Sequence, residues 1–188
     1  SAVAIEFLHN AFLVHDDIED GSLYRRNRAA LYIEEGVPMA VNVGDAMNAL
    51  SAASLIENIH VLGAELAYRI WHEVHHLVLQ SVEGQALELG RTRDNVFSLG
   101  EDDYLRMVLK KTCWYTCIHP CRIGALIGSA GRIDADRFNL FGFLLGAAFQ
   151  IQDDVLNLIG DRSLYGKEIL GDIWEGKRTL MLVHTLEN

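Results

Sequence analysis

The chain has little proline and little cysteine, and each shortage narrows the choice of fold and compartment. Its 188 residues include only two prolines, which leaves most of the chain free to form helices, because proline interrupts the hydrogen bonding of a helix interior. Its three cysteines all lie between positions 113 and 121 and are odd in number, so a disulfide framework is not expected. This cysteine usage is typical of a reducing compartment, and we expect a cytoplasmic protein.

Long basic runs and long apolar runs are also missing. The formal net charge is −10 and the longest basic cluster is confined to residues 25–28, which argues against a protein that tracks nucleic acid. The longest nearly uncharged stretch, residues 140–151, is interrupted by glycine and is shorter than the roughly 20 residues that span a bilayer. We therefore expect neither a nucleic-acid partner nor a membrane-spanning helix.

Apolar and helix-forming residues are plentiful. Half of the residues are apolar, which is enough for the core of one domain, and residues 46–55 are a run of good helix formers. We predict one all-α domain over residues 1–188. Both ends fall inside helical patterns without capping signals, so we expect a bundle truncated at both ends.

The helices are expected between clear turn signals. Turn chemistry occurs at residues 21–22, 35–38, 119–120 and 160–163. Gly44, Gly124 and Gly128 are interpreted as points of close helix approach. The expected helices cover residues 2–20, 38–58, 61–90, 101–118, 121–130, 134–160 and 177–187.

A first acidic stripe ends the first expected helix. Asp16, Asp17 and Asp20 crowd its last turn, because residues three and four apart share a helical face. Their like charges repel one another and lie at the negative end of the helix dipole. A solvated helix end is one explanation. A hard divalent cation is the other, since carboxylates presented this way suit Mg²⁺ that shares phosphate oxygens.

A second acidic stripe ends a long apolar segment. Gln150, Asp153, Asp154 and Asn157 follow the spacing of one helical face, and residues 138–149 before them are mostly apolar. Carboxylates at the end of a buried helix are costly unless they are paired or bound to a metal. Two such stripes are much harder to explain as solvated helix ends than one.

Basic residues follow each acidic stripe. Arg25 and Arg26 come about one turn after the first stripe. Lys167, Lys177 and Arg178 come after the second, across short segments that contain glycine. Metal ligands together with cationic donors are what a diphosphate needs for binding and for departure as a leaving group. The residues therefore predict transfer or cleavage at a diphosphate ester.

With these motifs, nearly the whole chain resembles the trans-isoprenyl diphosphate synthases. The sequences of its motifs are most similar to those of bacterial geranylgeranyl and farnesyl diphosphate synthases. Residues 15–22 with the two arginines look like the family's first aspartate-rich motif, and residues 149–154 look like its second. The resemblance implies the isoprenoid synthase fold, an all-α bundle around a central cavity. Further matching segments are residues 42–46, 83–85, 111–112, 166–167 and 171–180.

The resemblance also implies a role for each matched residue. Asp16, Asp17 and Asp20 on one wall, and Asp153 with Asp154 on the other, would hold three Mg²⁺ ions around an allylic diphosphate. His9 and Arg26 would bind isopentenyl diphosphate. The residues implied to contact the allylic diphosphate are Arg25, Lys111, Thr112, Gln150, Lys167 and Lys177, the last five as catalytic residues.

The implied reaction begins with ionisation of the allylic diphosphate, which is dimethylallyl, geranyl or farnesyl diphosphate. The isopentenyl double bond attacks the resulting carbocation, and a proton is then lost, to the departing diphosphate. Members of this family are usually homodimers, so the resemblance also implies a second copy of the chain as a partner.

The sequence departs from the family pattern in three places. Asn157 stands where the family usually has the last aspartate of its second motif, so we expect weaker metal binding. Residues 27–32 replace the usual Gly-x-Pro-x-x-His stretch after the two arginines. The family's N-terminal Gly-Lys-x-x-Arg segment, which binds isopentenyl diphosphate, has no counterpart in the 188 residues.

Side chains before the first stripe predict the product length. Residues one and two turns before Asp16 point away from the metals, so Phe12, Leu13 and Leu8 are expected to line the pocket for the growing tail. One helical turn of about 5.4 Å is close to the reach of one isoprene unit. With Phe12 limiting the depth and Ala11 opening space beside it, we expect C20 geranylgeranyl diphosphate, with C15 farnesyl diphosphate as the alternative.

Two further patterns receive a structural interpretation. His72, Glu73 and His76 match the zinc-protease spacing H-E-x-x-H, but no third ligand is compelling and the acidic stripes would be unexplained. We interpret them as a solvated helix face. The cysteines at four-residue intervals from Cys113 to Cys121 are interpreted as small packing residues.

Two other functions remain open. Asp153, Asn157 and Asp161 have a spacing similar to the second metal motif of class I terpene cyclases, although a cyclase does not need Arg26 and His9 for a second diphosphate. The departures from the family pattern also allow a catalytically weak partner subunit that modulates a true synthase.

Overall fold

The computed structural model describes residues 1–160 and 169–187 and confirms the all-α class. No helix within these ranges is long and apolar enough to cross a membrane. In chain order the elements are α1 (Ala2–Asp20), β1 (Tyr24–Arg25), β2 (Arg28–Ala29), α2 (Leu31–Glu35), α3 (Val37–Ile56), α4 (Asn58–Leu62), α5 (Ala64–Arg93), α6 (Glu101–Val108), the π-helical η1 (Leu109–Ile118), α7 (His119–Gly128), the 3₁₀ turn η2 (Ala135–Phe138), α8 (Asn139–Ile159), α10 (Gly171–Trp174) and α11 (Leu180–Glu187).

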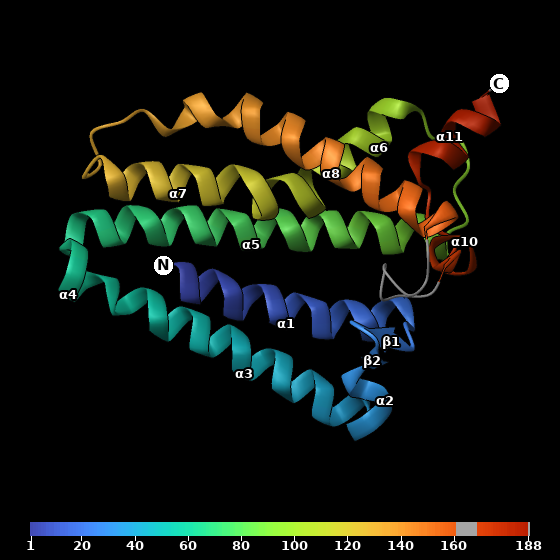
Figure 1. Ribbon diagram of the computed structural model, residues 1–188, viewed down its shortest axis with the longest axis horizontal. Coiled ribbons are helices and arrows are strands. Elements are labelled where there is room, and N and C mark those ends of the chain that lie inside the picture. Colours follow the sequence, from blue (N-terminus) through green and yellow to red (C-terminus); the bar gives the residue numbers. More distant parts are fainter. Residues whose placement is uncertain (161–168, 188) are drawn as a thin grey trace.

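The long helices form two groups. Figure 1 shows α8, α7, α5, α1 and α3 one below another, with β1, β2, α2, α6, α10 and α11 at the end where α1 and α8 finish and α4 at the opposite end. Helix α1 packs on α3, whereas α5 packs on α7 and on η1, which in turn packs on α8. The space between these two groups contains the candidate site.

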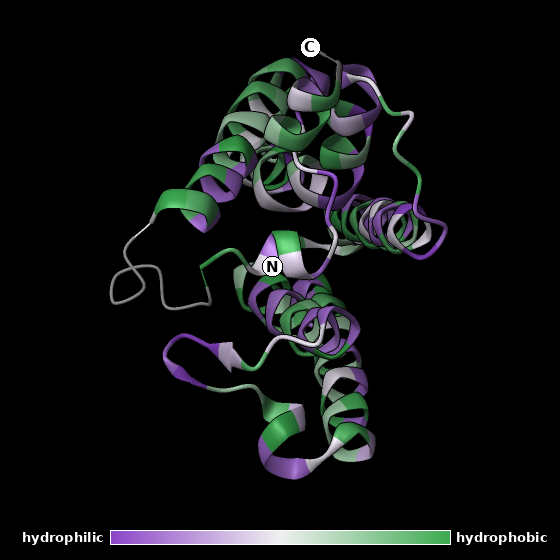
Figure 2. Ribbon diagram, turned by 90° about the vertical axis from the view of Figure 1, so that its right-hand side faces the viewer, coloured by the Kyte–Doolittle hydropathy of each residue, from purple (hydrophilic) through white to green (hydrophobic). Residues whose placement is uncertain are grey.

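Two apolar clusters hold the helices together. Each fully buried Leu, Ile or Met side chain contributes about 1.5–3 kcal/mol relative to an exposed one. Figure 2 shows hydrophobic and hydrophilic residues on the same helices, as expected for helices with one face in a core. The first cluster joins α1, α3, α5 and α7 through Ala4, Leu8, Leu55, Ile70, Val74, Leu77 and Ile123. The second joins α6, η1 and α8 through Tyr104, Met107, Val108, Cys113, Ile118 and Ala147.

Helix η1 is held between α5 and α8 at backbone distance. A Cβ built on Gly84 of α5 would lie 2.2 Å from the backbone nitrogen of Lys111. A Cβ built on Gly146 of α8 would lie 2.8 Å from the Cα of Cys113. Cys113 and Cys117 are buried, which confirms their interpretation as packing residues. The glycines therefore fix the position of Lys111 and its neighbours against two other helices.

The glycine expectations were only partly correct. Gly44 does mark a close approach, because a Cβ there would lie 2.2 Å from Nε2 of His15 on α1. Gly124 and Gly128 have no heavy atom within 4 Å of the position a Cβ would take, so for them the expectation is wrong. Sequence position does not show which face of a helix a glycine occupies.

The predicted break at residues 119–120 is wrong. Helical conformation continues from α6 through η1 into α7. The backbone N–H of His119 donates to the carbonyl of Trp114, five residues earlier, which is the hydrogen bonding of a π-helix. Pro120 then lies in the first turn of α7, where proline is tolerated because no N–H partner is needed.

Residues 27–32, which depart from the family pattern, form the end of a hairpin and the start of α2. Strands β1 and β2 pair Arg25 with Arg28, which leaves Arg26 and Asn27 as a two-residue turn. Both have positive φ, 53° and 63°, as a type I′ turn requires. Helix α2 was not predicted, because five residues are too few for a periodic pattern.

Candidate active site

A cavity of about 970 Å³ lies between the two groups of helices. Leu8, Leu55 and Val74 line one end, whereas the other end, here called the head, carries charged side chains. A smaller cavity of about 110 Å³ adjoins the head and also has Asp16 and Asp153 in its wall. The charged residues in the wall of the larger cavity include Asp16, Glu19, Arg25, Arg26, Lys111 and Asp153.

Basic side chains from distant elements contact the acidic end of α1. Arg25 Nη2 and Lys111 Nζ each lie 3.4 Å from a carboxylate oxygen of Asp16. Lys177 Nζ donates to Asp20 Oδ2 at 2.6 Å. The predicted cationic residues and the predicted first metal wall are therefore brought together, from the hairpin, from η1 and from the segment after α10.

Asp17 differs from Asp20 in its hydrogen-bond partner. Its carboxylate accepts a hydrogen bond from Arg25 Nε at 2.9 Å, whereas Asp20 is bound by Lys177; neither Asp17 nor Asp20 lines a cavity wall. Its carbonyl oxygen also accepts from the backbone N–H groups of Gly21 and Ser22. Asp17 thus anchors the hairpin to α1, and its role as a metal ligand stays a prediction.

The acidic end of α8 is held by a chain of hydrogen bonds. Thr112 Oγ1 donates to Gln150 Oε1 at 2.8 Å, and Gln150 Nε2 donates to Asp154 Oδ1 at 2.8 Å. The Tyr104 hydroxyl donates to the other Asp154 oxygen at 2.7 Å. Burial raises the pKa of Asp154 and these two donors oppose the rise. Asp153 contributes to the walls of both cavities.

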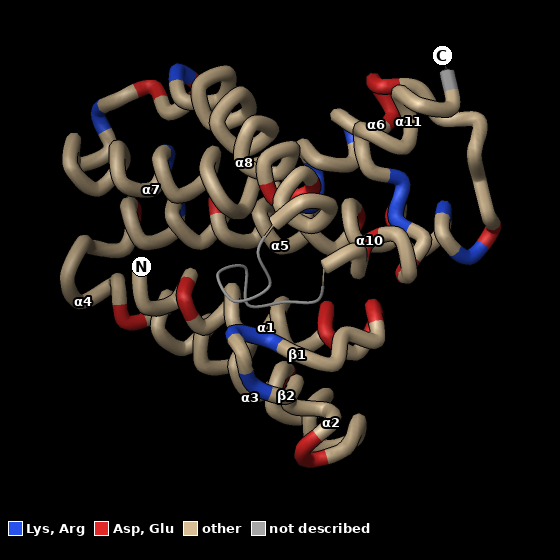
Figure 3. The backbone as a smooth tube through the Cα atoms, turned by 45° about the vertical axis from the view of Figure 1, so that its right-hand side comes forward, with Lys and Arg blue, Asp and Glu red and all other residues tan. Residues whose placement is uncertain are grey.

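At the head, the negative charge of the carboxylates exceeds the positive charge of the nearby lysines and arginine. Burial, reinforced by Asp16, raises the pKa of Asp20 to about 6, and burial raises the pKa of Asp172 to about 6. Although burial opposes it, Glu88 and Asp16 hold the pKa of Lys111 above its ordinary value. Figure 3 shows acidic and basic positions gathered around α10 and the ends of α1 and α8. This surplus of negative charge favours binding of a cation.

The donor set fits hard divalent ions. Carboxylate oxygens are the ligands that Mg²⁺ and Ca²⁺ prefer. No three potential ligands among the residues that the structure describes converge on one preformed point. Asp16 and Asp20 come from α1 and Asp153 and Asp154 from α8, so cations between them have room to share oxygens with a bound diphosphate.

Asn157 supports α10. Its side-chain oxygen accepts a hydrogen bond from the backbone N–H of Asp172 at 3.2 Å, and its backbone carbonyl accepts from Leu170 at 2.8 Å. The asparagine is buried. The residue that replaces the family's aspartate therefore positions the segment that carries Asp172.

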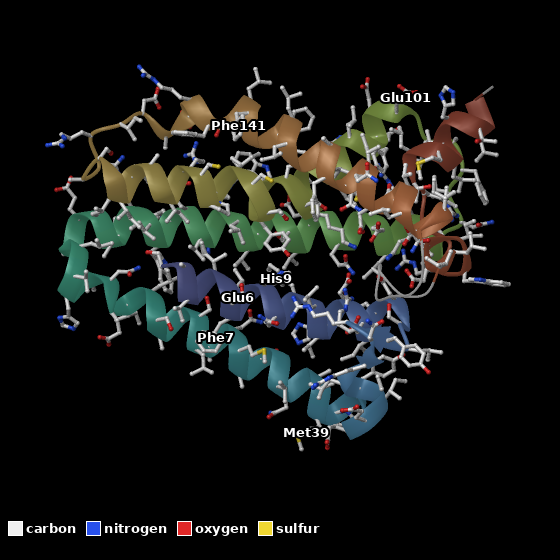
Figure 4. The ribbon with its side chains drawn as sticks, viewed as in Figure 1. Glu6, Phe7, His9, Met39, Glu101 and Phe141 are labelled. Carbon is white, nitrogen blue, oxygen red and sulfur yellow. The ribbon has the colours of Figure 1, made fainter. Side chains whose placement is uncertain are left out.

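His9 and Tyr115 meet inside the cavity. His9 Nδ1 and the Tyr115 hydroxyl are hydrogen-bonded at 2.5 Å, and their rings stack with centroids 5.7 Å apart. Burial and the nearby Arg26 lower the pKa of His9, which favours a neutral imidazole. Arg26 also lines the cavity, so the two residues implied to bind isopentenyl diphosphate belong to one site. Figure 4 labels His9 on α1.

Three of the four predicted tail-pocket residues line the cavity. They are Leu8, Phe12 and Leu13, and Phe12 packs edge-on against Tyr115. Ala11 is fully buried but is not part of the wall. It lies on the helical face of His15, which approaches Gly44 of α3, so the expectation that it opens space beside Phe12 is wrong.

Three residues at the head were missed by sequence reasoning, and one predicted residue lies outside the described ranges. Glu88 contacts Lys111, Tyr104 contacts Asp154, and Asp172 lies near Lys177. Glu88 could have been found three residues after the family's Gln85, but nothing in the sequence marks Tyr104. Lys167 falls between residues 161 and 168, outside the described residues.

The residues that match H-E-x-x-H do not form a metal site. Glu73 accepts hydrogen bonds from His119 Nδ1 at 2.7 Å and from Arg122 Nε at 2.6 Å, and His76 Nδ1 lies 2.8 Å from His119 Nε2. His72 instead packs against Tyr68. The prediction of a solvated face is therefore wrong for Glu73, which joins α5 to α7 in what we call the Glu73 cluster: Glu73, His76, His119 and Arg122.

Comparison with known proteins gives a consistent result. A family model described as polyprenyl synthetase matches residues 1–188. The geranylgeranyl diphosphate synthase of Saccharolobus solfataricus is 34% identical over 187 residues, which cover 99% of this chain and 55% of that protein. The short chain isoprenyl diphosphate synthase of Methanothermobacter thermautotrophicus is 33% identical over 186 residues, with 99% and 55% covered.

A solved structure has the same fold. The polyprenyl synthase from Caulobacter crescentus, complexed with calcium and isoprenyl diphosphate, is similar with a TM-score of 0.85 and 29% identity. The match covers 98% of this chain and 53% of that one. The chain thus spans about half the length of the relatives that it matches.

Proposed function

Because this chain belongs to the polyprenyl synthetase family, we propose that the protein containing it is a short-chain prenyl diphosphate synthase that condenses isopentenyl diphosphate with an allylic diphosphate. One observation carries the proposal. The acidic ends of α1 and α8 and the side chains of Arg25, Lys111 and Lys177 meet at the head of a largely apolar cavity of about 970 Å³. A charged head and an apolar body match the two parts of an allylic diphosphate.

The head binds the diphosphate and prepares it to leave. Asp16 and Asp20 on one wall, and Asp153 with Asp154 on the other, are the proposed ligands of Mg²⁺. When bound, these ions neutralise charge on the leaving diphosphate. Arg25, Lys111 and Lys177 donate charge-assisted hydrogen bonds to the same oxygens. Asp17 positions Arg25, and its role as a metal ligand stays a prediction.

The reaction forms one carbon–carbon bond. The bond from the allylic carbon to oxygen breaks, and diphosphate leaves with the electron pair. The isopentenyl double bond supplies the electrons of the new bond, and the resulting cation loses a proton to the departing diphosphate. The oxygens of Thr112 and Gln150 lie beside the head, and the apolar wall excludes water that would capture the carbocation.

The second substrate is proposed to lie against His9 and Arg26. A neutral His9 donates or accepts one hydrogen bond, and Arg26 supplies the positive charge for the isopentenyl diphosphate. We also propose a cytoplasmic homodimer that binds three Mg²⁺ ions per site. Apolar side chains exposed on α8, such as those of Leu140 and Phe141, support an outer face covered by a second copy of the chain. Figure 4 labels Phe141 on α8.

We propose geranylgeranyl diphosphate as the product. The cavity continues past Phe12 to Leu8, two turns before Asp16, so the depth is not limited by Phe12 alone. Farnesyl diphosphate is the alternative if Phe12 and Tyr115 close the passage.

The decisive experiment is a product analysis of the full-length protein. The protein is incubated with Mg²⁺, isopentenyl diphosphate and each allylic primer in turn, and products are identified by mass spectrometry before and after phosphatase treatment. Prenyl alcohols that appear only after phosphatase support the proposal and report the chain length. Asp16→Asn serves as the inactive control.

Other outcomes identify the competing functions. Hydrocarbons formed from an allylic diphosphate alone would indicate a terpene cyclase, but the cyclase-like spacing has lost support, because Asn157 is engaged with Asp172 of α10. A folded protein that binds Mg²⁺ and diphosphate without turnover would indicate a partner subunit.

A further inference from the structure

Helix α5 lines the cavity along its whole length with a single stripe. Trp71, Val74, Val78, Gln85 and Leu89 all contribute to the wall at the three- and four-residue spacing of one helical face. Figure 1 shows α5 as a long straight helix beside α1. The depth of the cavity can therefore be measured along this helix.

On α5, Gln85 marks the end of the cavity that carries the charged side chains. Its side-chain nitrogen lies 3.4 Å from Asp16 Oδ1, so Gln85 is level with the acidic end of α1. Trp71 lies fourteen residues earlier on α5, which is about 21 Å at a rise of 1.5 Å per residue. This is about four helical turns, and one turn is close to one isoprene unit. The stripe is thus about four isoprene units long.

The far end of the cavity is lined by packed side chains and by Trp71. Leu8, Leu55 and Val74 belong both to the wall and to the first apolar cluster. Ile70, next to Trp71, is fully buried in that cluster. Trp71 is the α5 wall residue farthest from the head, and it is 38% exposed, so its side chain borders both the cavity and solvent.

The Glu73 cluster holds this part of α5 in place. Glu73 and His76 lie on the helical face opposite Trp71 and Val78. Their hydrogen bonds to His119 and to Arg122 join α5 to α7 within two turns of Trp71. The rotation of α5 about its axis, and with it the direction of the Trp71 side chain, is therefore constrained.

We propose that Trp71 closes the far end of the tail cavity and limits the product to four isoprene units. This inference rests on the proposed function and adds a length-determining residue on α5 to those expected on α1. Tails shorter than four units do not reach the indole, whereas a fifth unit would have to displace it. Replacement of Trp71 by a small residue opens the cavity toward solvent at that point.

The test compares Trp71→Ala with Tyr68→Ala in the full-length protein. Tyr68 is an exposed aromatic residue on the same helix and does not line the cavity, so its truncation controls for general effects on α5. With excess isopentenyl diphosphate, Trp71→Ala is expected to shift the main product by at least one five-carbon unit beyond the wild-type length. Tyr68→Ala is expected to leave the product distribution unchanged.

A variant that fills part of the cavity tests whether a shorter cavity gives a shorter product. His75 is exposed, lines the cavity and lies ten residues before Gln85, about 15 Å or three turns from the head. His75→Phe is expected to shift the main product one unit shorter. This variant keeps the test decisive if Trp71→Ala fails to fold.

The outcomes separate this inference from the proposed function. A wild-type protein that makes no prenyl diphosphate removes the proposed function. An active wild type whose product length is the same in Trp71→Ala and in His75→Phe overturns the role of Trp71 alone. Equal lengthening by Tyr68→Ala would also overturn it, because loosening of α5 would then explain the effect.

Discussion

Two groups of ionisable side chains lie along α5, and they differ in how their charge is balanced. At the head of the cavity, burial and the nearby charge of Asp16 raise the pKa of Asp20 to about 6. Burial also raises the pKa of Asp172 to about 6. At the Glu73 cluster, burial is outweighed by hydrogen bonds from Arg122 and His119, which lower the pKa of Glu73 to about 2. The first group has a surplus of negative charge and the second does not.

This difference in charge balance is what distinguishes a candidate cation-binding site, the head, from a structural ion pair, the Glu73 cluster. Carboxylates whose pKa is raised are unfavourable in their charged form, so a cation from outside the chain would stabilise the head. The carboxylate of Glu73 already has its cation within the fold. A sequence pattern of acidic residues and histidines does not distinguish the two cases, because the balancing groups come from other helices.

The largest effect is expected from removing one carboxylate at the head. Asp16→Asn should reduce the rate of prenyl transfer by about 10²–10³-fold, because the group acts on charge that develops in the transition state. Steady-state condensation rates with isopentenyl diphosphate measure the effect. Asp94→Asn, an exposed acidic residue paired with Arg93, is the matched control and should retain full activity.

Metal binding gives a second readout of the same variant. Mg²⁺ with inorganic diphosphate should raise the melting temperature of the wild type, and chelation should reverse the shift. A ligand at 100 times its dissociation constant stabilises by about 2.7 kcal/mol. The shift should be lost in Asp16→Asn and kept in Glu73→Gln. An equal shift in both variants would contradict the distinction between the two groups.

The next effect is expected on stability, at the Glu73 cluster. Glu73→Gln should lower the free energy of unfolding by about 1–2 kcal/mol at pH 7, because the pKa of Glu73 is lowered from 4.5 to about 2 and solvent screening reduces the energy of this half-buried pair. A lowered pKa stabilises the fold above the unfolded value, so the difference from wild type should shrink below pH 4.5 and disappear near pH 2. Urea unfolding between pH 7 and pH 3 measures it.

A control on the same helix sharpens this result. Glu83 is paired with Lys110 at the surface of α5, and its replacement by glutamine should change stability much less than Glu73→Gln does. If Glu73→Gln is as stable as wild type at pH 7, or if the difference does not change with pH, the Glu73 cluster does not have the assigned structural role.

A smaller effect is expected where a neutral donor supports a head carboxylate. Tyr104→Phe removes the hydroxyl that donates to Asp154 at 2.7 Å and leaves a buried oxygen without that donor. Supporting contacts of this kind change metal affinity by about 10–100-fold, and we expect the lower end. The Mg²⁺ concentration for half-maximal activity measures the change, with Tyr68→Phe as the exposed control.

The smallest effect is expected at the departure from the family pattern. Asn157→Asp keeps an acceptor for the N–H of Asp172 and adds a negative charge to a region that already has a surplus. The variant should be less stable without Mg²⁺ and should need less Mg²⁺ for activity, by under about tenfold. A higher Mg²⁺ requirement would show that the added charge does not contact the metals.

The acidic ends of α1 and α8 could be predicted from the sequence, because helical spacing is a local property. Asp16 with Asp20, and Asp153 with Asp154, were identified from their separation along the chain alone. The resemblance to a family added Lys111 and Lys177, which the structure brings to the carboxylates of α1. Pro120 misled the helix prediction, because a change of hydrogen-bonding pattern before it is not visible in the sequence.

The amino-acid sequence by itself determined the all-α class, the two acidic helix ends and the apolar face of α1 that lines the cavity. Only the tertiary structure decided that Asp17 binds Arg25, that Ala11 faces α3 and that Glu73 is an internal ion pair. The physical reason is separation along the chain. Lys177 contacts Asp20 across 157 residues and His119 contacts Glu73 across 46, and such pairs depend on how the helices pack.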